Sequence, residues 1–281
     1  MSRNNRNSSF SDYDQFAWLF NREWSFFACQ VFFTINRIVE GLLPPGAKIL
    51  DLCCGTGQLA KALSEKGYRV TGLDAAPEML RFARDNAPEV EFIQEDARAF
   101  RLPAAFDAVF STYDSLNHLM SAKELQEVFL NVFNCLKVGG IFLFDLNTEK
   151  AYRKQWKGYL DVIERPDYFY VNRANYDARK RVGTTHCTLF RRQGKNWQRS
   201  EVKLYQKYYP VARVESWLQS AGFGQLRKYA VGSEGGVRQF TEKDARIFIL
   251  CRKPPESVER VKDWRPGSSK SLDKGTGRRN I

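Results

Sequence analysis

Two glycines and an aspartate set the first functional hypothesis. Gly55, Gly57 and Ala60 form a G-x-G-x-x-A motif directly after the apolar run AKILDL at residues 47–52. Glycines at this spacing allow a tight turn and let the backbone approach a ligand closely. Asp74 follows the first glycine by nineteen positions, and an acid placed there can accept hydrogen bonds from both hydroxyls of an adenosine ribose. Nicotinamide dinucleotides and S-adenosylmethionine both contain that ribose, so the motif alone leaves both ligands open.

Two further aspartates favour S-adenosylmethionine. Asp51 ends the apolar run just before the glycine loop, where a carboxylate attracts the ammonium and sulfonium of this cofactor but repels a pyrophosphate. Asp96 ends the segment VEFIQEDA, placed to accept a hydrogen bond from an adenine amino group. Two simpler readings remain open. The glycines would then form only a strand-to-helix turn, and Asp51 would only brace the loop through backbone N–H groups.

Acceptor chemistry is expected at the segment YDSLNHL, Tyr113–Leu119. His118 has a free pKa near neutrality and can take a proton from an acceptor hydroxyl or ammonium. A structural role for this histidine is equally compatible with the sequence. Asp114 and Asn117 are the other polar candidates, and Tyr13, in an aromatic segment ahead of the sheet, is a candidate for a cation-π contact with the sulfonium.

Alternating strands and helices must position these residues. Apolar runs at 47–52, 68–75, 90–97, 106–113 and 141–147 predict strands, and stripes at 58–66, 76–86 and 122–136 predict helices between them. Ser121 and Glu124 have the spacing of a capping box. Such alternation requires a parallel sheet with helices on both faces and ligands at the carboxyl ends of the strands. The predicted strand ends are polar: Asp51, Asp74, Asp96, Thr112–Asp114 and Asn147.

The stretches ILDLCCGTGQLAKAL, VTGLDAAPEML, FIQEDAR, FDAVFSTYDSLNHL and LKVGGIFLFDLN, in this order, resemble the class I S-adenosylmethionine-dependent methyltransferases. The resemblance implies a doubly wound, mostly parallel seven-stranded α/β sheet and S-adenosylmethionine as cofactor. It also implies that the glycine loop holds the amino acid part of the cofactor, that the acid after the second strand holds ribose, and that the acid after the third holds adenine. The cofactor contacts implied in this way are Asp51, Cys53, Gly55, Gly57, Asp74, Ala75, Met79, Asp96, Ala97 and Thr112. Cys54 departs from the family, in which many members have glycine.

The YDSLNHL segment resembles the D-S-L-N-[YH]-L segment of bacterial small-molecule methyltransferases, including those that dimethylate amino sugars. In such enzymes an aromatic segment like residues 10–45 covers the cofactor, which is why Tyr13 is retained as a catalytic candidate beside His118, Asp114 and Asn117. Most other aromatic side chains of that segment are expected to pack in the core.

Positive charge is concentrated in two parts of the chain. Residues 151–212 contain 14 basic and 5 acidic residues and 12 aromatic ones, and residues 252–281 contain 9 basic and 4 acidic residues. Alternation around the turn Gln193–Asn196 predicts that 151–212 forms an inserted antiparallel cap over the active site. The predicted organisation is a disordered segment 1–9, a methyltransferase domain 10–253 and a disordered basic tail 254–281. Within the domain we expect covering helices at 10–45, the cofactor core at 46–150, the cap at 151–212 and a final helix and strands at 213–253.

Several classes of protein are excluded by composition. The apolar fraction of 43% rules out disorder throughout, and the longest apolar run, Ser25–Phe33, is too short to cross a membrane. No secretory signal is visible, so a cytoplasmic protein is expected. The 6 cysteines include no C-x-x-C pair, which favours reduced core thiols over a metal site.

We therefore expect a methyltransferase that acts on a small metabolite, as a monomer or homodimer. The basic cap favours an anionic acceptor, such as a nucleotide-linked amino sugar. Methylation of RNA or protein is an alternative that would use the basic cap and tail, although no N-P-P-Y-like tetrapeptide is present. A cofactor- or RNA-binding scaffold without turnover and a dinucleotide oxidoreductase are further alternatives.

Overall fold

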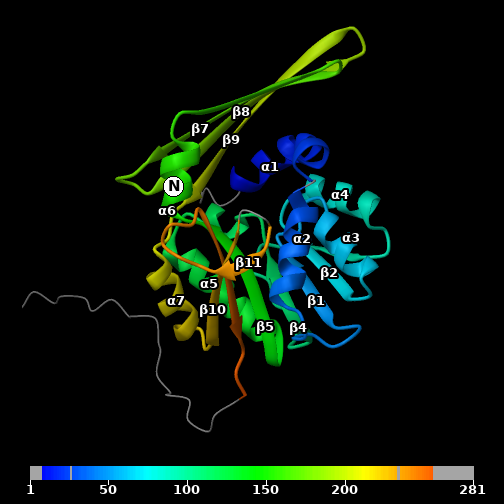
Figure 1. The fold of residues 1–281 in the computed structure, drawn as a ribbon. Coiled ribbons are helices and arrows are strands. Elements are labelled where there is room, and N and C mark those ends of the chain that lie inside the picture. Colours follow the sequence, from blue (N-terminus) through cyan, green and yellow to red (C-terminus); the bar gives the residue numbers. More distant parts are fainter. Residues whose placement is uncertain (1–7, 26, 233–234, 256–281) are drawn as a thin grey trace, which may run out of the picture.

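The computed structural model describes residues 8–25, 27–232 and 235–255. All five predicted strand segments form neighbouring strands of one large sheet (Figure 1). Their bounds are β1 Lys48–Leu52, β2 Arg69–Asp74, β3 Glu91–Gln94, β4 Phe106–Ser111 and β5 Leu136–Asn147. The pairs β1–β2, β2–β3, β1–β4 and β4–β5 are all parallel. The chain reverses its direction of travel across the sheet between β1 and β4, the switch point at which sheets of this class bind ligands.

Antiparallel strands extend the sheet beyond β5, in the order β11-β10-β12-β5-β4-β1-β2-β3. They are β10 Gly224–Val231, β11 Val237–Gln239 and β12 Arg246–Arg252. The described sheet thus has 8 strands, where the sequence predicted seven. The additional strand, β11, spans only 3 residues and is too short to leave a periodic pattern.

Helices cover both faces of this sheet (Figure 1). On one face, α2 Phe27–Ile38 and α3 Gln58–Glu65 pack apolar side chains against the sheet, and α4 Pro77–Asn86 lies beside α3. On the other face lie α5 Ala122–Cys135 and α7 Val211–Ser220. The doubly wound α/β class predicted from the sequence is confirmed.

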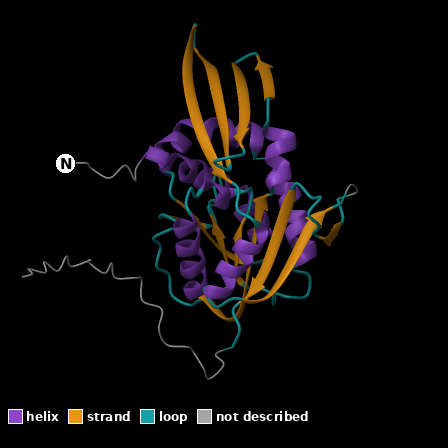
Figure 2. Ribbon diagram, turned by 90° about the vertical axis from the view of Figure 1, so that its left-hand side faces the viewer, coloured by secondary structure: helices purple, strands orange, loops and turns teal. Residues whose placement is uncertain are grey.

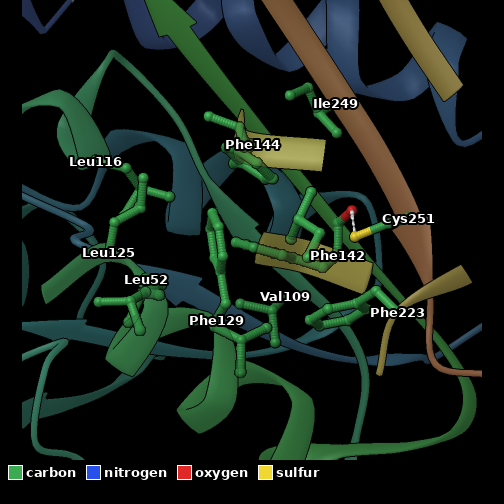
Figure 3. Close-up of a cluster of buried hydrophobic side chains, with 14 of the residues drawn as sticks. Leu52, Val109, Leu116, Leu125, Phe129, Phe142, Phe144, Phe223, Ile249 and Cys251 are labelled. Atoms are coloured by element: carbon green, nitrogen blue, oxygen red, sulfur yellow. Dashed lines mark hydrogen bonds between the residues drawn. The ribbon is translucent and has the colours of Figure 1, made fainter. Parts of the chain in front are cut away.

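The face under α5 contains a cluster of aromatic side chains. Phe129 of α5 lies against Phe142 and Phe144 of β5, whose rings stack with centroids 4.6 Å apart (Figure 3). The predicted capping box is present, because the Ser121 side chain accepts from the Glu124 N–H and the Glu124 side chain accepts from the Ser121 N–H. The helix ends at Cys135, however, and β5 already begins at Leu136, so residues 137–140, between the predicted helix and the predicted strand, are part of a long strand.

A second, antiparallel sheet forms the inserted cap (Figure 2). Its strands are β6 Tyr159–Arg165, β7 Tyr168–Asp177, β8 Val182–Gln193 and β9 Asn196–Lys207, reached through α6 Glu149–Ala151 and η3 Tyr152–Trp156. One face of this cap packs on the N-terminal helix α1 Ser8–Leu19 and the π-helical turn η1 Phe20–Trp24. Helix α1 begins at Ser8, inside the segment predicted to be disordered, while most of the predicted disordered tail lies outside the described residues.

Over the described residues, no helix is both long and apolar enough to cross a membrane. The same part of the chain holds no group of three or more metal-ligating side chains. The described cysteine side chains are free thiols, at Cys53, Cys54, Cys135, Cys187 and Cys251.

Candidate active site

The carboxyl ends of β1 and β2 place two predicted carboxylates at the switch point. Asp51 is buried at the end of β1, with 2% of its surface exposed, and its Oδ2 atom has no hydrogen-bond partner. Burial, reinforced by the nearby charge of Asp74, raises the pKa of Asp51 from 3.8 to about 7. A buried carboxylate oxygen without a partner is costly, so this position suits a ligand that carries positive charge.

Asp74 ties the glycine loop to the end of β2. Its Oδ2 accepts the Gly55 N–H at 2.9 Å, and its Oδ1 accepts the Ala76 N–H at 2.9 Å. Burial raises the pKa of Asp74, although these backbone hydrogen bonds act to lower it. Each carboxylate oxygen has a second lone pair, so Asp74 can hold the loop and still accept from ribose hydroxyls.

Gly57 begins α3 in a backbone conformation that favours glycine. Its φ is +82°, and a Cβ atom built there would lie 2.9 Å from the Cβ atom of Ala83 in α4. We expect Gly57→Ala to lower the free energy of unfolding by about 2–4 kcal/mol. The cost of a left-handed backbone at a residue with a Cβ atom adds to the cost of its close contact with Ala83. Gly139→Ala is the matched control, since Gly139 has φ +78° with nothing within 4 Å, and it should cost only about 1 kcal/mol. Urea denaturation measures both, and equal losses would contradict the packing argument.

Asp96 lies at the same edge, but its carboxylate already has a cationic partner. Arg98 binds it through Nε and Nη2, the latter at 2.7 Å, and also reaches Glu124 at 2.8 Å. An adenine amino group would therefore share Asp96 with Arg98, a partner that the sequence did not indicate. Ala97 is buried, and its carbonyl oxygen accepts from the Asn131 side chain at 3.1 Å.

The remaining predicted cofactor residues surround the same edge. Met79 is buried under α1 with Phe16 and Ala76, Thr112 is buried beyond β4, and Ala75 is half-buried. Cys53 adopts φ 61° between Asp51 and the glycine loop, and burial raises the pKa of its thiol. The groups at this edge fit S-adenosylmethionine. They are the unpartnered carboxylate oxygen of Asp51, the backbone N–H groups of the glycine loop, and Asp74 at the ribose position.

The N-terminal segment closes over this loop from above. The Phe20 ring lies 3.5 Å from an ideal Cβ position on Gly55, and the Asn21 side chain accepts hydrogen bonds from Gln58 at 2.7 Å and Asn86 at 2.8 Å. The aromatic segment that the sequence placed over the cofactor therefore contacts the glycine loop directly.

Asp51 predicts a pH dependence of cofactor binding. Because its pKa in the folded protein is raised, stability from this group is present at low pH and is lost as pH rises through about 7. A bound cation favours the ionised carboxylate, so the Kd for S-adenosylmethionine should fall about tenfold between about pH 6 and about pH 8.

Asp51→Asn is the test variant, measured by calorimetry and thermal unfolding in one buffer series. This variant should bind S-adenosylmethionine weakly, with a Kd that does not change between about pH 6 and about pH 8. The substitution should also stabilise the ligand-free protein at high pH, by on the order of 3 kcal/mol. If the Kd and the thermal stability of the wild-type and variant proteins changed with pH in parallel, Asp51 would not titrate in this range.

The segment predicted to face the acceptor follows β4, where the backbone is strained. Tyr113 has φ 68° and Asp114 has φ 49°, a conformation that costs about 1–3 kcal/mol per residue and clusters at functional sites. Arg246 of β12 forms ion pairs with Asp114, at 2.6 Å, and with Asp145 of β5. Two buried carboxylates and one guanidinium give this cluster a formal net charge of −1.

His118 ends the short 3₁₀ turn η2 Ser115–His118 and faces the cap. Its Nε2 lies 2.9 Å from the side-chain nitrogen of Gln206 in β9, and its ring meets Tyr13 edge-on, with centroids 5.4 Å apart. Burial lowers the pKa of His118, although the charge of Asp114 acts to raise it. The lowered pKa favours the neutral form of His118.

Asn117 is committed to hydrogen bonds with the backbone. Its Oδ1 accepts the Asn147 N–H at 2.9 Å, and its Nδ2 donates to the Lys207 carbonyl at 2.8 Å. The residue is fully buried. Asn117 thus joins the main sheet to the cap, which is a positioning role.

The basic residues of the cap are almost all exposed. Lys207 is half-buried and donates to the Lys180 carbonyl, and the other 13 basic residues of 151–212 are exposed. Among the hydrogen bonds and ion pairs of the described residues, Arg246 is the cation that contacts Asp114 and Asp145.

Comparison with known proteins identifies the family. The family described as "Methyltransferase domain" matches residues 49–140. YqeM of Bacillus subtilis (strain 168), described as a methyltransferase, is 33% identical over 225 residues, which cover 78% of this chain and 89% of YqeM. A dTDP-3-amino-3,4,6-trideoxy-alpha-D-glucopyranose N,N-dimethyltransferase of Streptomyces venezuelae is 30% identical over 111 residues, 40% of this chain and 47% of that enzyme.

A solved structure shares the whole architecture. The S-adenosylmethionine-dependent methyltransferase of Clostridium acetobutylicum ATCC 824 superposes with a TM-score of 0.72 at 22% identity, covering 86% of this chain and 99% of that one. The chain belongs to the class I S-adenosylmethionine-dependent methyltransferases. Its cofactor is S-adenosylmethionine, as the sequence predicted.

Proposed function

We propose that the protein methylates an amino group of a small molecule, with the acceptor bound between η2 and the cap. The observation that carries this proposal is the cluster of the buried carboxylates Asp114 and Asp145 with the half-buried Arg246, which has a formal net charge of −1. It lies beside His118, whose pKa is lowered by burial. Such a site attracts a protonated amine and offers a base for its proton. The similarity to an amino-sugar N,N-dimethyltransferase supports the same class of acceptor.

The chain's own residues then have separate tasks. Asp51 balances the positive charge of the cofactor, Asp74 holds the glycine loop and the ribose, and Asp96 with Ala97 lies at the adenine end. S-adenosylmethionine supplies an electrophilic methyl group when bound. Alignment and exclusion of water are the main contributions that a protein makes to such a displacement, and α1 with the cap provides both.

His118 removes the proton that an acceptor ammonium must lose before its nitrogen becomes a nucleophile. Its lowered pKa keeps it neutral, and the imidazolium formed would lie beside the Asp114 carboxylate, which stabilises it. Tyr13 covers the edge of the ring. Asp114 and Tyr13 therefore support His118.

The experiment compares matched acceptors. The protein is incubated with S-adenosylmethionine and amino sugars, their sugar nucleotides, and the hydroxyl analogues of both, with products read by mass spectrometry. Methylation of amino compounds only is the expected result. Methylation of the hydroxyl analogues alone would overturn the choice of acceptor atom.

A second candidate, an RNA acceptor, is favoured by the exposed basic residues of the cap. Exposed Trp197 and Tyr205 lie on strand β9 among basic side chains, an arrangement that suits phosphates and stacked bases. Bulk tRNA and rRNA are therefore included in the same assay, and methyl transfer to them with none to amines would replace the first candidate by the second.

A further inference from the structure

Gln206 of β9 makes hydrogen bonds to four side chains at the junction of the cap and the main sheet. It is buried, with 3% of its surface exposed. Its Oε1 accepts from Tyr152 Oη at 2.9 Å and from Asn147 Nδ2 at 3.2 Å. Its Nε2 donates to Asp114 Oδ2 and lies 2.9 Å from Nε2 of His118. A single cap residue thus contacts two of the three polar candidates of the acceptor segment, Asp114 and His118.

The orientation of the Gln206 amide follows from these partners. An amide oxygen and nitrogen look alike in shape, and their assignment depends on the hydrogen-bond network. A rotated amide would point its oxygen at the Asp114 carboxylate and its NH₂ group at the NH₂ group of Asn147. The hydrogen bonds to Asp114 and from Asn147 would both be lost, and like partial charges would repel each other. The NH₂ group of Gln206 therefore faces Asp114 and His118.

This orientation decides which nitrogen of His118 carries the proton. Because Gln206 presents a donor to Nε2, that nitrogen must be the acceptor of the neutral ring. A hydrogen bond to the Tyr205 backbone raises the pKa of His118, as a bond donated by the ring does. Nδ1 is the nitrogen left to donate it, so β9 holds both sides of the imidazole.

We infer that Gln206 is a positioning residue, which fixes His118 as the Nδ1–H tautomer and leaves Nε2 as the basic nitrogen, held in a hydrogen bond to the Gln206 amide. This inference rests on the proposed role of His118 as the base. The N–H of an incoming amine would take the place at Nε2 that the Gln206 amide occupies. Assembly of the base therefore depends on the cap, because β9 supplies the residue that orients it.

Several ionisable groups belong to the same network as His118 and bear on any pH effect. Asp114 acts on His118 directly, and Tyr13 of α1 lies against its ring. Asp145, Arg246 and Tyr152 are connected to it through Asp114 or Gln206. Removal of the Gln206 amide leaves Asp114 without one of its donors, so its charge acts more strongly on His118. The pKa of His118 should then rise.

The test reads the imidazole directly by nitrogen NMR of protein labelled at histidine. The chain has only 2 histidines, and His186, whose side chain is 41% exposed, is the internal reference. In the wild type, His118 should show a protonated Nδ1 and an unprotonated Nε2. In Gln206→Leu its pKa should rise by at least about one pH unit, and the acidic limb of the kcat profile should move upward by the same amount.

Two further variants complete the test. Gln206→Glu keeps the shape of the side chain but reverses the polarity toward His118, so the ring should be doubly protonated at neutral pH and methyl transfer should be lost. Gln198→Leu changes the same residue type on the same strand, at an exposed position bonded to Gln193, and should leave His118 and the rate unchanged.

Two outcomes would overturn the inference. One is an Nε2–H tautomer in the wild type, and the other is an unaltered His118 titration in folded Gln206→Leu. If Gln206→Leu does not fold, the wild-type tautomer and the shape-conserving Gln206→Glu decide the question. The expected tautomer without methylation of any amine would leave the inference standing and refute the proposed acceptor instead.

Discussion

Asp74→Ala is expected to weaken S-adenosylmethionine binding by about 100-fold or more, close to 3 kcal/mol. The variant loses the ribose acceptor and, at the same time, the two hydrogen bonds that Asp74 accepts from Gly55 and Ala76 at 2.9 Å. Each charge-assisted bond contributes about 1.5–3 kcal/mol. The effect therefore combines a missing ligand contact with a loosened loop, and titration calorimetry measures it.

Two variants separate these contributions. Asp74→Asn keeps one acceptor oxygen and should bind with intermediate affinity. Asp107→Ala is the matched control, because Asp107 also accepts a backbone N–H, from Lys48 at 2.8 Å, at the amino-terminal end of β4. It should leave cofactor binding unchanged, and a folded Asp74→Ala protein with wild-type affinity would contradict the assigned ribose site.

Arg246→Met is expected to lower the free energy of unfolding by about 3–5 kcal/mol, because it leaves Asp114 and Asp145 buried together without their cation. Burial raises the pKa of Asp145, and the charge of Arg246, together with the backbone N–H of Asp114, acts against this. A raised carboxyl pKa gives stability at low pH that is lost as pH rises. The variant should therefore be closest to wild type in acid and weakest at high pH, as measured by urea denaturation across a pH series.

Arg252→Met, on the same strand, is the control. Arg252 is half-buried and donates to the Gly139 carbonyl at 2.7 Å, so its loss should cost about 1 kcal/mol with no such pH dependence. Adding Asp145→Asn to Arg246→Met should recover part of the lost stability. Equal costs for the two arginine variants at every pH would refute the charge-cluster argument.

Much of the cofactor half could be predicted from the sequence because its signals are local. The strand ending at Asp51, the glycine turn and the acid at Asp74 occur within one strand–helix–strand unit, and the capping box at Ser121 is a four-residue pattern. Strand β11 and the early start of β5 at Leu136 were missed. In both cases pairing with a neighbouring strand, which no local pattern records, determines the structure.

The acceptor half could be predicted only in part, because its contacts join distant positions. Asp114 is separated from Gln206 by 92 residues and from Arg246 by 132. Spacing along the chain carries no trace of such pairs, and a glutamine in a strand has no distinctive signature. Asn117 shows the opposite case, since its residue type suggested chemistry while the fold gives it backbone partners.

Titration calorimetry of the wild-type protein with S-adenosylmethionine, S-adenosylhomocysteine and NAD tests the central claim most directly. The first two share the nucleoside and amino acid parts that Asp74, the glycine loop and Asp51 are placed to hold, whereas NAD brings a pyrophosphate toward the Asp51 carboxylate. We predict micromolar binding of S-adenosylmethionine and S-adenosylhomocysteine and no binding of NAD. Binding of NAD alone would contradict the account, because the fold would then serve a dinucleotide and the assigned site would be wrong.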